Sequence, residues 1–290
     1  MERELWPPLY RALRVVAKDV RQKYVQYQPW VLVAVFLWAA LPDRPVSWAC
    51  QRRPWGAPTL RPARLPSPAT LSRRIDSPGV GLLWRALEAH LRAAGAPPAL
   101  VAFVDGKPLP VGGNSKDPDA HGGRGAGGLA QGYKRHAVWS TRAVPEAWDL
   151  TALNANEKAR AADLAGQLRY GGYLWGDGND DASYVFDAAA ARGYQLVVPL
   201  PDGENPGCGK HYQSPYRLRS IALQRSAFGR ALYRARTAIE RSFGHAGSFG
   251  GGLAPLPAWV RGQPRVRTWV WAKLLINGVR IVRNHRLRRL

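Results

Sequence analysis

Three acidic residues stand at positions that could support metal chemistry. Asp105 and Asp177 each follow an apolar run, and Glu240 lies in a helix-like stretch. Carboxylate oxygens are the ligands that Mg²⁺ and Mn²⁺ prefer, and ions held in this way can catalyse phosphoryl transfer. Singly, each acid has a plainer interpretation, because Asp-Gly is common in turns and Glu240 could pair with Arg236 on a solvated helix face. Taken together, the three acids predict a divalent metal site.

The chain around these acids is strongly basic. It has 42 lysines and arginines against 20 acidic residues, a net charge of +22, in 290 residues. A charge of this size and sign favours a polyanionic partner, either nucleic acid or an anionic membrane surface, and association with a ribosome is a competing interpretation. Cations would contact phosphates while the carboxylates hold metal. The composition therefore points to an enzyme that cuts DNA.

The cysteines and the apolar residues exclude several other classes. Cys50 and Cys208 are far apart and have no C-x-x-C spacing, so neither a disulfide framework nor a zinc site is expected. The longest apolar stretch, Trp30 to Leu41, is shorter than the roughly 20 residues that span a bilayer. We expect a soluble, cytoplasmic protein that associates with the nucleoid and has no membrane partner.

Residues 1–98 are expected to form a mostly helical DNA-binding domain. Apolar residues recur at helical spacing from Tyr10 to Leu41, and Gln28-Pro29 divides this segment into two helices. Residues 42–68 are rich in proline and arginine, which predicts an irregular basic connector whose Trp55 could stack on a base.

A short helix is predicted to begin where the connector ends. Ser67 can cap it and Pro68 suits its first turn. Its basic residues Arg73 and Arg74 resemble the start of a recognition helix. An ordinary surface helix fits the same residues equally well. A second helix over 81–94 then precedes Pro97-Pro98, which closes the first domain.

Residues 99–290 are expected to form the catalytic domain, which alternates between strand and helix patterns and ends in a basic C-terminal helix. The predicted elements are strands over 100–104, 133–140 and 144–153, a helix over 157–169, a strand over 172–176, a helix over 181–192, a strand over 194–200 and a helix over 226–244. A glycine-rich loop is expected over 106–132. This order predicts an α/β fold of the ribonuclease-H-like class, with a mixed five-stranded sheet and flanking helices. Asp105 and Asp177 would end two of its strands, where an open α/β sheet places its ligand crevice.

Four short motifs resemble those of a known family. Tyr233-x2-Arg236-x3-Glu240 is the core of the Tyr-Arg-Glu-Lys signature of DDE transposases from bacterial insertion sequences. Residues 104–107 (VDGK) are similar to the first acidic motif of that family, residues 132–136 (GYKRH) to its G-Y-K-x-H strand and residues 176–181 (GDGNDD) to its second acidic motif. The resemblance covers residues 99–282 well and the first 98 residues loosely.

The resemblance implies a function and a set of site residues. Such an enzyme binds the terminal inverted repeats of its element, cleaves the DNA ends and joins the 3′-OH to target DNA with two Mg²⁺ or Mn²⁺ ions. Asp105, Asp177 and Glu240 would be the catalytic metal ligands. The residues expected to contact DNA are Tyr233, Arg236, Lys107, Lys134, Arg241, Arg73 and Arg74. The partners would be double-stranded transposon ends and target DNA, bound by a homodimer.

The chain departs from the family pattern at two positions. Gly247 stands where the signature has its lysine, and Asp180 stands where the second acidic motif usually has an aromatic residue. Arg241 or Lys273 could supply the missing phosphate contact, or this copy could be impaired. Two other functions fit the same residues: a structure-selective ribonuclease-H-like nuclease or resolvase, and a decayed relic that binds DNA without cutting it.

Overall fold

The computed structural model describes residues 2–112, 114–125, 127–199, 213–232, 253 and 256–287, with the side chains of residues 2, 3, 286 and 287 left aside. The chain divides into two compact units. One is helical and consists of Met1–Ala96, Ala246–Leu253 and Trp259–Leu290. The other is built on a sheet and consists of Pro97–His245 and Ala254–Ala258.

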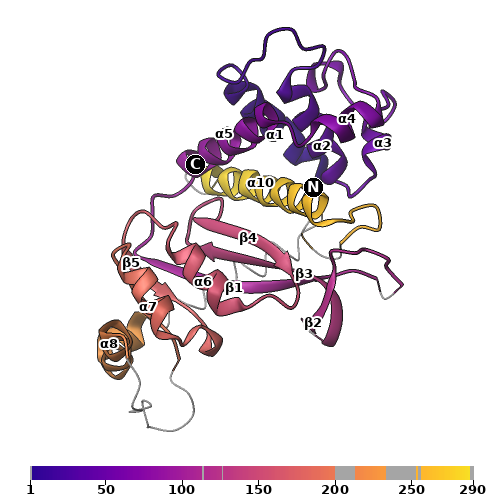
Figure 1. Ribbon diagram of the computed structural model, residues 1–290. Helices are drawn as coiled ribbons and strands as arrows, with labels where there is room; N and C mark the ends of the chain where they lie inside the picture. The colour runs from indigo at the N-terminus through magenta and orange to yellow at the C-terminus, as the bar shows by residue number, and fades with distance from the viewer. Residues whose placement is uncertain are drawn as a thin grey trace. The chain divides into compact units, whose positions relative to one another are not determined.

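The helical unit confirms the two predicted N-terminal helices and the short capped helix after the connector. Its elements are α1 (Glu2–Val16), α2 (Pro29–Ala40), α3 (Val46–Ala49), η1 (Pro58–Leu60), α4 (Pro68–Arg74), α5 (Pro78–Ala94) and α10 (Gln263–Leu287) (Figure 1). The Ser67 hydroxyl caps α4 by accepting a hydrogen bond from the backbone N–H of Thr70 at 3.2 Å. This cap with Pro68 in the first turn is the start signal that the sequence carried.

Helix α2 is the core of the helical unit. Every residue of α2 except Trp30 is buried, and α1, α3, α5 and α10 all contact it. A helix that is apolar on all sides must be surrounded by other elements. Within the described ranges, no helix combines the length and the hydropathy that a bilayer crossing requires.

A cluster of tryptophans packs beside α2 and corrects one prediction. Trp38 stacks on Trp48 and on Trp55, with ring centroids 5.9 Å and 5.2 Å apart. Trp55, which we expected to be free to stack on a base, is buried, and its Nε1 donates to the carbonyl oxygen of Ala49 at 2.8 Å. The sequence of the connector hides this, because an irregular backbone can still return an aromatic ring to the core.

An ion pair with a buried lysine joins the turn after α2 to the C-terminal helix. Lys273 of α10 has a fully buried side chain, and its Nζ lies 2.8 Å from Oδ1 of Asp43. The same Asp43 oxygen accepts a hydrogen bond from Nε1 of Trp269 at 3.1 Å. Lys273 is therefore a structural residue of the helical unit, and the phosphate contact that we considered for it does not fit its burial.

The C-terminal helix belongs to a different unit from the one we expected. We assigned all of residues 99–290 to the catalytic domain, whereas α10 packs against α1, α2 and α5 of the helical unit. Its buried residues, among them Val270, Leu274 and Ile276, complete the core around α2. The boundary at Ala96 and Pro97 lies close to the predicted one at residue 98. As a division of function, the two domains stay a prediction.

The second unit has the mixed sheet with flanking helices that the ribonuclease-H-like class requires. Its strands are β1 (Val101–Pro110), β2 (His121–Gly125), β3 (Gly128–Trp139), β4 (Ala147–Ala152), β5 (Gly172–Trp175) and β6 (Tyr194–Val197). Its described helices are α6 (Glu157–Ala165), η2 (Gly178–Asp180), α7 (Ser183–Ala190) and α8 (Pro215–Arg225). Strand β3 pairs antiparallel with β1, β2 and β4, whereas β1, β5 and β6 run parallel in that order.

The glycine-rich segment 106–132 is more regular than we predicted. Strand β1 continues to Pro110 instead of ending at Asp105, and β2 adds a strand, so the described residues form six strands where we expected five. Glycine itself permits part of this pairing, because a Cβ on Gly132 would lie 2.4 Å from the carbonyl oxygen of Leu109. The glycines here allow strands to approach closely rather than keeping the chain irregular.

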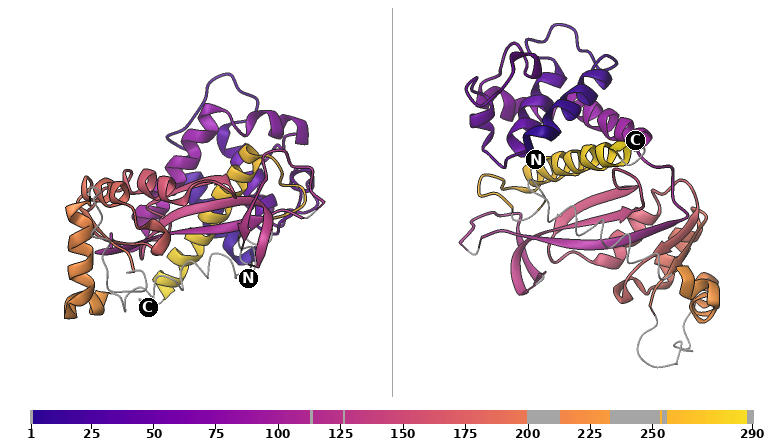
Figure 2. Two further views of the ribbon diagram at one scale, coloured as in Figure 1. Left: turned by 60° about the horizontal axis from the view of Figure 1, so that its bottom comes forward. Right: turned by 180° about the vertical axis from the view of Figure 1, so that it is seen from behind.

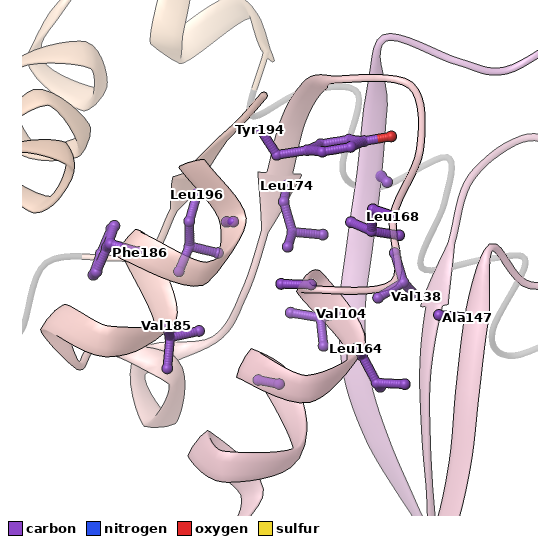
Figure 3. Packing of buried hydrophobic residues seen from close by; sticks show 14 of the residues in the cluster. Val104, Val138, Ala147, Leu164, Leu168, Leu174, Val185, Phe186, Tyr194 and Leu196 are labelled. Atoms are coloured by element: carbon purple, nitrogen blue, oxygen red, sulfur yellow. The ribbon is translucent and has the colours of Figure 1, made fainter. Parts of the chain in front are cut away.

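Helices α6 and α7 cover one face of the sheet (Figure 1). The core between these helices and the sheet includes Val104 of β1, Leu164 of α6, Leu168 just after α6, Leu174 of β5 and Phe186 of α7 (Figure 3). Helix α8 lies beside α7 and β6 (Figures 1 and 2). We did not predict α8, although Ser214 and Pro215 at its start repeat the pattern of Ser67 and Pro68. The helix that we predicted over 226–244 is present over 227–232, and the rest of it lies outside the described residues.

Candidate active site

Asp105 and Asp177 lie at matching positions of two neighbouring parallel strands. The β1–β5 ladder pairs Val101 with Tyr173 and ends where Phe103 pairs with Trp175. Each pair is 72 residues apart, and Asp105 and Asp177 are also separated by 72 (177 − 105). Both acids therefore stand two residues beyond the last pair of the ladder.

Asp105 lies within β1, beside the point where the neighbouring strand β5 ends. Strand β1 runs on to Pro110 and stays paired with β3 along this length, whereas β5 stops at Trp175. The carboxylate of Asp105 is half-buried, and its Oδ2 lies 3.1 Å from Nζ of Lys107 on the same strand face. An acid on a strand whose neighbouring strand has already ended is open to a ligand at the carboxyl edge of the sheet.

Asp177 and Asp180 hold the turn after β5 by a reciprocal capping pair. The Asp177 carboxylate accepts a hydrogen bond from the backbone N–H of Asn179 at 2.8 Å, and Asp180 Oδ2 accepts from the N–H of Asp177 at 3.1 Å. Asp177 is exposed, whereas Asp180 is only 6% exposed. Gly176 leaves room for Asp180, because a Cβ there would lie 2.6 Å from Asp180 Oδ2.

The acids form an electrostatic group around Asp180. Burial, followed by repulsion from Asp177, raises the pKa of Asp180 from 3.8 to about 7, and Glu157 and Asp105 add smaller repulsion. The hydrogen bond from the backbone of Asp177 acts in the opposite direction. Negative charge is therefore concentrated at this edge of the sheet, although the chain as a whole is basic. A cation near these carboxylates would relieve the repulsion between them.

Lys134 and His136 point to the other face of β3 and are buried. Lys134 forms an ion pair with Glu157 of α6. His136 shares a hydrogen bond of 2.9 Å with Oγ1 of Thr151, and burial lowers its pKa to about 4. We expected Lys134 to contact DNA, but its side chain is buried and its ammonium is already paired with the half-buried carboxylate of Glu157.

Arg135 lies on the Asp105 side of the sheet. It pairs across the strands with Lys107, and it is only 2% exposed. Its Nε and Nη1 have no hydrogen-bond partner among the described residues. Burial lowers the pKa of Arg135 to about 10, and Asp105 acts in the opposite direction. We predicted no role for Arg135, although it lies within the GYKRH motif.

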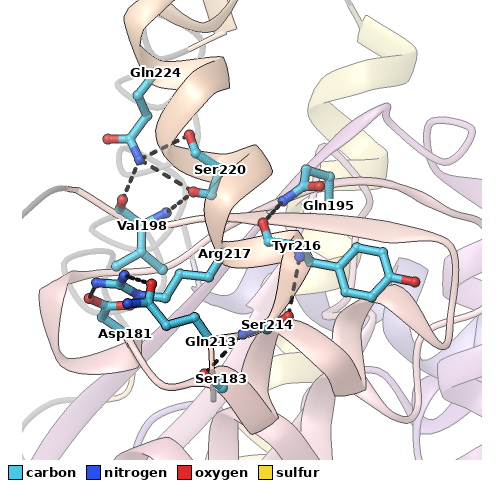
Figure 4. A network of polar contacts seen from close by, with 10 residues as sticks. All are labelled: Asp181, Ser183, Gln195, Val198, Gln213, Ser214, Tyr216, Arg217, Ser220 and Gln224. Atoms are coloured by element: carbon cyan, nitrogen blue, oxygen red, sulfur yellow. Dashed lines mark hydrogen bonds and ion pairs between the residues drawn. The ribbon is translucent and has the colours of Figure 1, made fainter. Parts of the chain in front are cut away.

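An ion pair and a set of hydrogen bonds fasten α8 to the segment that follows Asp177. Arg217 donates from Nε and Nη2 to the two oxygens of Asp181, at 2.7 Å and 2.8 Å (Figure 4). The Ser214 hydroxyl donates to Oδ1 of Asp187 on α7 at 2.6 Å. A two-pronged pair between a guanidinium and a carboxylate fixes both distance and orientation. Asp181 thus anchors the C-terminal end of the turn that Asp177 begins.

Comparison with known families shows the family to which the chain belongs. The family model described as "Transposase DDE domain" matches residues 96–275, which are 180 of the 290 residues. The chain belongs to the transposase DDE-domain family. No curated protein and no solved structure shows significant similarity to it. The match covers the sheet unit and the first half of α10. It confirms a DDE transposase of the insertion-sequence type with a ribonuclease-H-like fold.

Transposases of this family generally use divalent metal ions, and the described carboxylates fit such ions in kind. Asp105, Asp177 and Asp180 offer hard oxygen ligands at one edge of the sheet. Among the described residues, no three metal-binding side chains converge on one point. The third predicted ligand, Glu240, lies outside the described residues, as do Tyr233, Arg236, Arg241 and Gly247. The described part of the site is therefore two aligned acids with a buried third beside them.

The two arginines predicted to contact DNA from the helical unit are accessible. Arg73 is exposed and Arg74 half-buried, and both lie in the last turn of α4. Neither takes part in an ion pair that the structure shows among the described residues. Their position is compatible with a DNA contact and equally with a solvated helix end.

Proposed function

We propose that this transposase binds the terminal inverted repeats of its element, cleaves the DNA ends and joins the freed 3′-OH to target DNA. The observation that carries the proposal is the alignment of Asp105 with Asp177 at the carboxyl edge of a ribonuclease-H-like sheet. Family membership supports transposition as the general activity. The strongly positive net charge supports DNA as the partner.

Asp105, Asp177 and Glu240 are proposed to hold two Mg²⁺ or Mn²⁺ ions. When bound, such ions activate water or a 3′-hydroxyl and stabilise the leaving oxygen of an in-line displacement. Asp105 would contribute to both ions, with Asp177 and Glu240 completing one side each. The ion pair of Lys107 with Asp105, at 3.1 Å, supports a contact between this lysine and a phosphate of the bound DNA. Lys107 can leave the carboxylate and bind that phosphate, since its side chain is half exposed.

DNA contacts are proposed for both units. Arg73 and Arg74 of α4 would bind the transposon end, while Tyr233, Arg236 and Arg241 would bind the backbone near the cut. A homodimer would hold two ends together, and the complex would be associated with the nucleoid. Lys134 is left out of this set because it is paired with Glu157 inside the sheet unit.

The experiment is cleavage of end-containing DNA in Mg²⁺ by Asp105→Asn and Asp177→Asn variants. We expect both variants to bind the DNA and to lose cutting by at least a hundredfold. Asp163→Asn is the matched control, because its carboxylate lies on α6 in an exposed pair with Arg160 at 2.9 Å. Normal cutting by Asp105→Asn would refute the site assignment.

The choice of substrate separates the alternative functions. Equal cutting of branched DNA with and without repeat ends would indicate a nuclease or resolvase. DNA binding by the wild-type protein without cutting in Mg²⁺ or Mn²⁺ would indicate a relic. Cutting that depends on the repeat ends and yields joined products supports the transposase.

A further inference from the structure

A pocket with a basic wall lies at the end of α1 in the helical unit. Its volume is about 210 Å³. The residues around it come from the last turn of α1, the turn that follows and the start of α2: Arg14, Ala17, Lys18, Arg21, Gln28 and Trp30. Three of these six carry positive charge and none is acidic. None of the three cations is among the residues that we predicted to contact DNA.

The walls of this pocket are held by specific contacts. Gln28 closes the turn, since its side chain accepts a hydrogen bond from the Gln22 backbone N–H at 3.0 Å and donates to the Gln22 carbonyl at 2.8 Å. The guanidinium of Arg14 lies over the Trp30 ring, 4.0 Å from its centroid. Trp30 in turn packs edge-on against Tyr10. Stacking restricts Arg14 before any ligand arrives, which lowers the entropy cost of binding.

The three cations of the pocket, Arg14, Lys18 and Arg21, are exposed and lack a carboxylate partner among the described residues. A cation near the last turn of a helix is favoured by the helix dipole, and this accounts for Arg14 in the last turn of α1. It does not account for two more cations around the same concavity, where like charges repel each other. An anion is the ligand that these side chains suit.

We propose that this pocket binds a phosphate of the DNA backbone, at a site separate from α4. The ligand class follows from the donors: guanidinium and ammonium groups donate hydrogen bonds and accept none, and arginine matches phosphate oxygens with two parallel bonds. Such a contact positions the protein on the duplex without reading its sequence. The inference rests on the proposed DNA-binding function and assigns to it a contact that the family motifs do not contain.

The first test is the salt dependence of binding to a duplex of arbitrary sequence. Each phosphate contact contributes about 0.9 to the slope of log K against log[salt]. We expect Lys18→Gln and Arg21→Gln each to lower the slope by up to about 0.9. Lys23→Gln removes the same charge from the same turn, is exposed and does not line the pocket. It should leave the slope nearly unchanged, and equal slopes for all three variants would overturn the proposal.

The second test locates the phosphate and separates DNA from free phosphate. Neutral methylphosphonate groups are placed one at a time along an end-containing duplex. At one position the neutral group should lower the affinity of the wild-type protein about 5- to 10-fold. The same group should leave the affinity of Lys18→Gln unchanged. If no such position exists while inorganic phosphate at millimolar concentration protects Lys18 from acylation, the pocket takes a free anion and the DNA assignment fails.

The two proposals fail in different ways. If the wild-type protein cuts repeat ends but the pocket variants behave like Lys23→Gln, only the pocket is refuted. If the wild-type protein does not bind DNA at all, both proposals are refuted. Because the three substituted side chains are exposed, the melting temperatures of the variants should match the wild type. A variant that matches it in this respect reports on binding rather than on folding.

Discussion

Asp180→Asn should stabilise the metal-free protein, and the gain should depend on pH. The carboxyl of Asp180 is buried beside Asp177, and its pKa is raised from 3.8 to about 7. Between these values the folded state holds a proton that the unfolded chain has released. The contribution that Asp180 makes to the free energy of unfolding is therefore fully present below about pH 4, and it is lost as pH rises through about 7.

The magnitude follows from the same pKa values. One pKa unit is worth about 1.36 kcal/mol, so a rise from 3.8 to about 7 corresponds to at most about 4 kcal/mol at pH 8. Asparagine carries no charge and can still accept the hydrogen bond that the Asp177 N–H donates. The variant should thus match the wild type near pH 4 and exceed it by up to about 4 kcal/mol at pH 8.

The assay is urea unfolding in EDTA, followed by circular dichroism at several pH values. Asp163→Asn is the control, because the exposed pair of Asp163 with Arg160 should be worth less than about 1 kcal/mol at any pH. Adding Mn²⁺ should narrow the gap between the wild type and Asp180→Asn, since bound cations would relieve the repulsion that the substitution removes. A gap that does not change between pH 4 and pH 8 would refute the electrostatic account, and so would a variant that is less stable at pH 8.

Three further predictions concern side chains whose contacts lie within one unit or the other. Asp43→Asn should lower the free energy of unfolding by about 3 kcal/mol, because it leaves the buried ammonium of Lys273 without its anion. Urea unfolding measures this loss, and a loss below about 1 kcal/mol would contradict the prediction. Arg217→Gln should lower the free energy of unfolding by about 2 kcal/mol in the same assay, because it releases Asp181 from its two hydrogen bonds. It should also raise the Mn²⁺ concentration needed for cutting. An unchanged dependence of cutting on Mn²⁺ would mean that the ion pair has a structural role only. His136 should stay neutral down to about pH 4, so its ring signals in an NMR titration should not move between pH 8 and pH 5.5.

The strands and their acids could be predicted from the sequence because each strand is a short apolar run that ends in polar residues. Val101–Val104, Leu174 and Trp175 are buried in the sheet as expected, and each acid stands two residues beyond the last paired residue of its strand, Phe103 or Trp175. What the pattern could not provide was the pairing partner. Which strand lies beside which decides that Asp105 and Asp177 share an edge, and that choice is made by contacts distant in sequence.

Where the sequence misled us, a side chain had found a partner within the folded protein. Trp55 reaches the Ala49 carbonyl and the ring of Trp38, Lys134 reaches Glu157, and Lys273 reaches Asp43. A lysine or tryptophan in isolation reads as a phosphate or base contact in so basic a chain. Only tertiary structure shows that the charge or the ring is already satisfied.

The departure at Asp180 is built into the turn and is not a sign of decay by itself. The family usually has an aromatic residue at this position, and a ring there could not accept the hydrogen bond from the Asp177 backbone that Asp180 accepts at 3.1 Å. Gly176 fits the same arrangement, because any larger residue would meet the Asp180 carboxylate. Since Asp177 is itself held by this turn, the substitution places a second carboxyl behind a proposed metal ligand while preserving the position of that ligand. The cost is the repulsion that raises the pKa of Asp180, and a cation bound at the neighbouring acids would offset it.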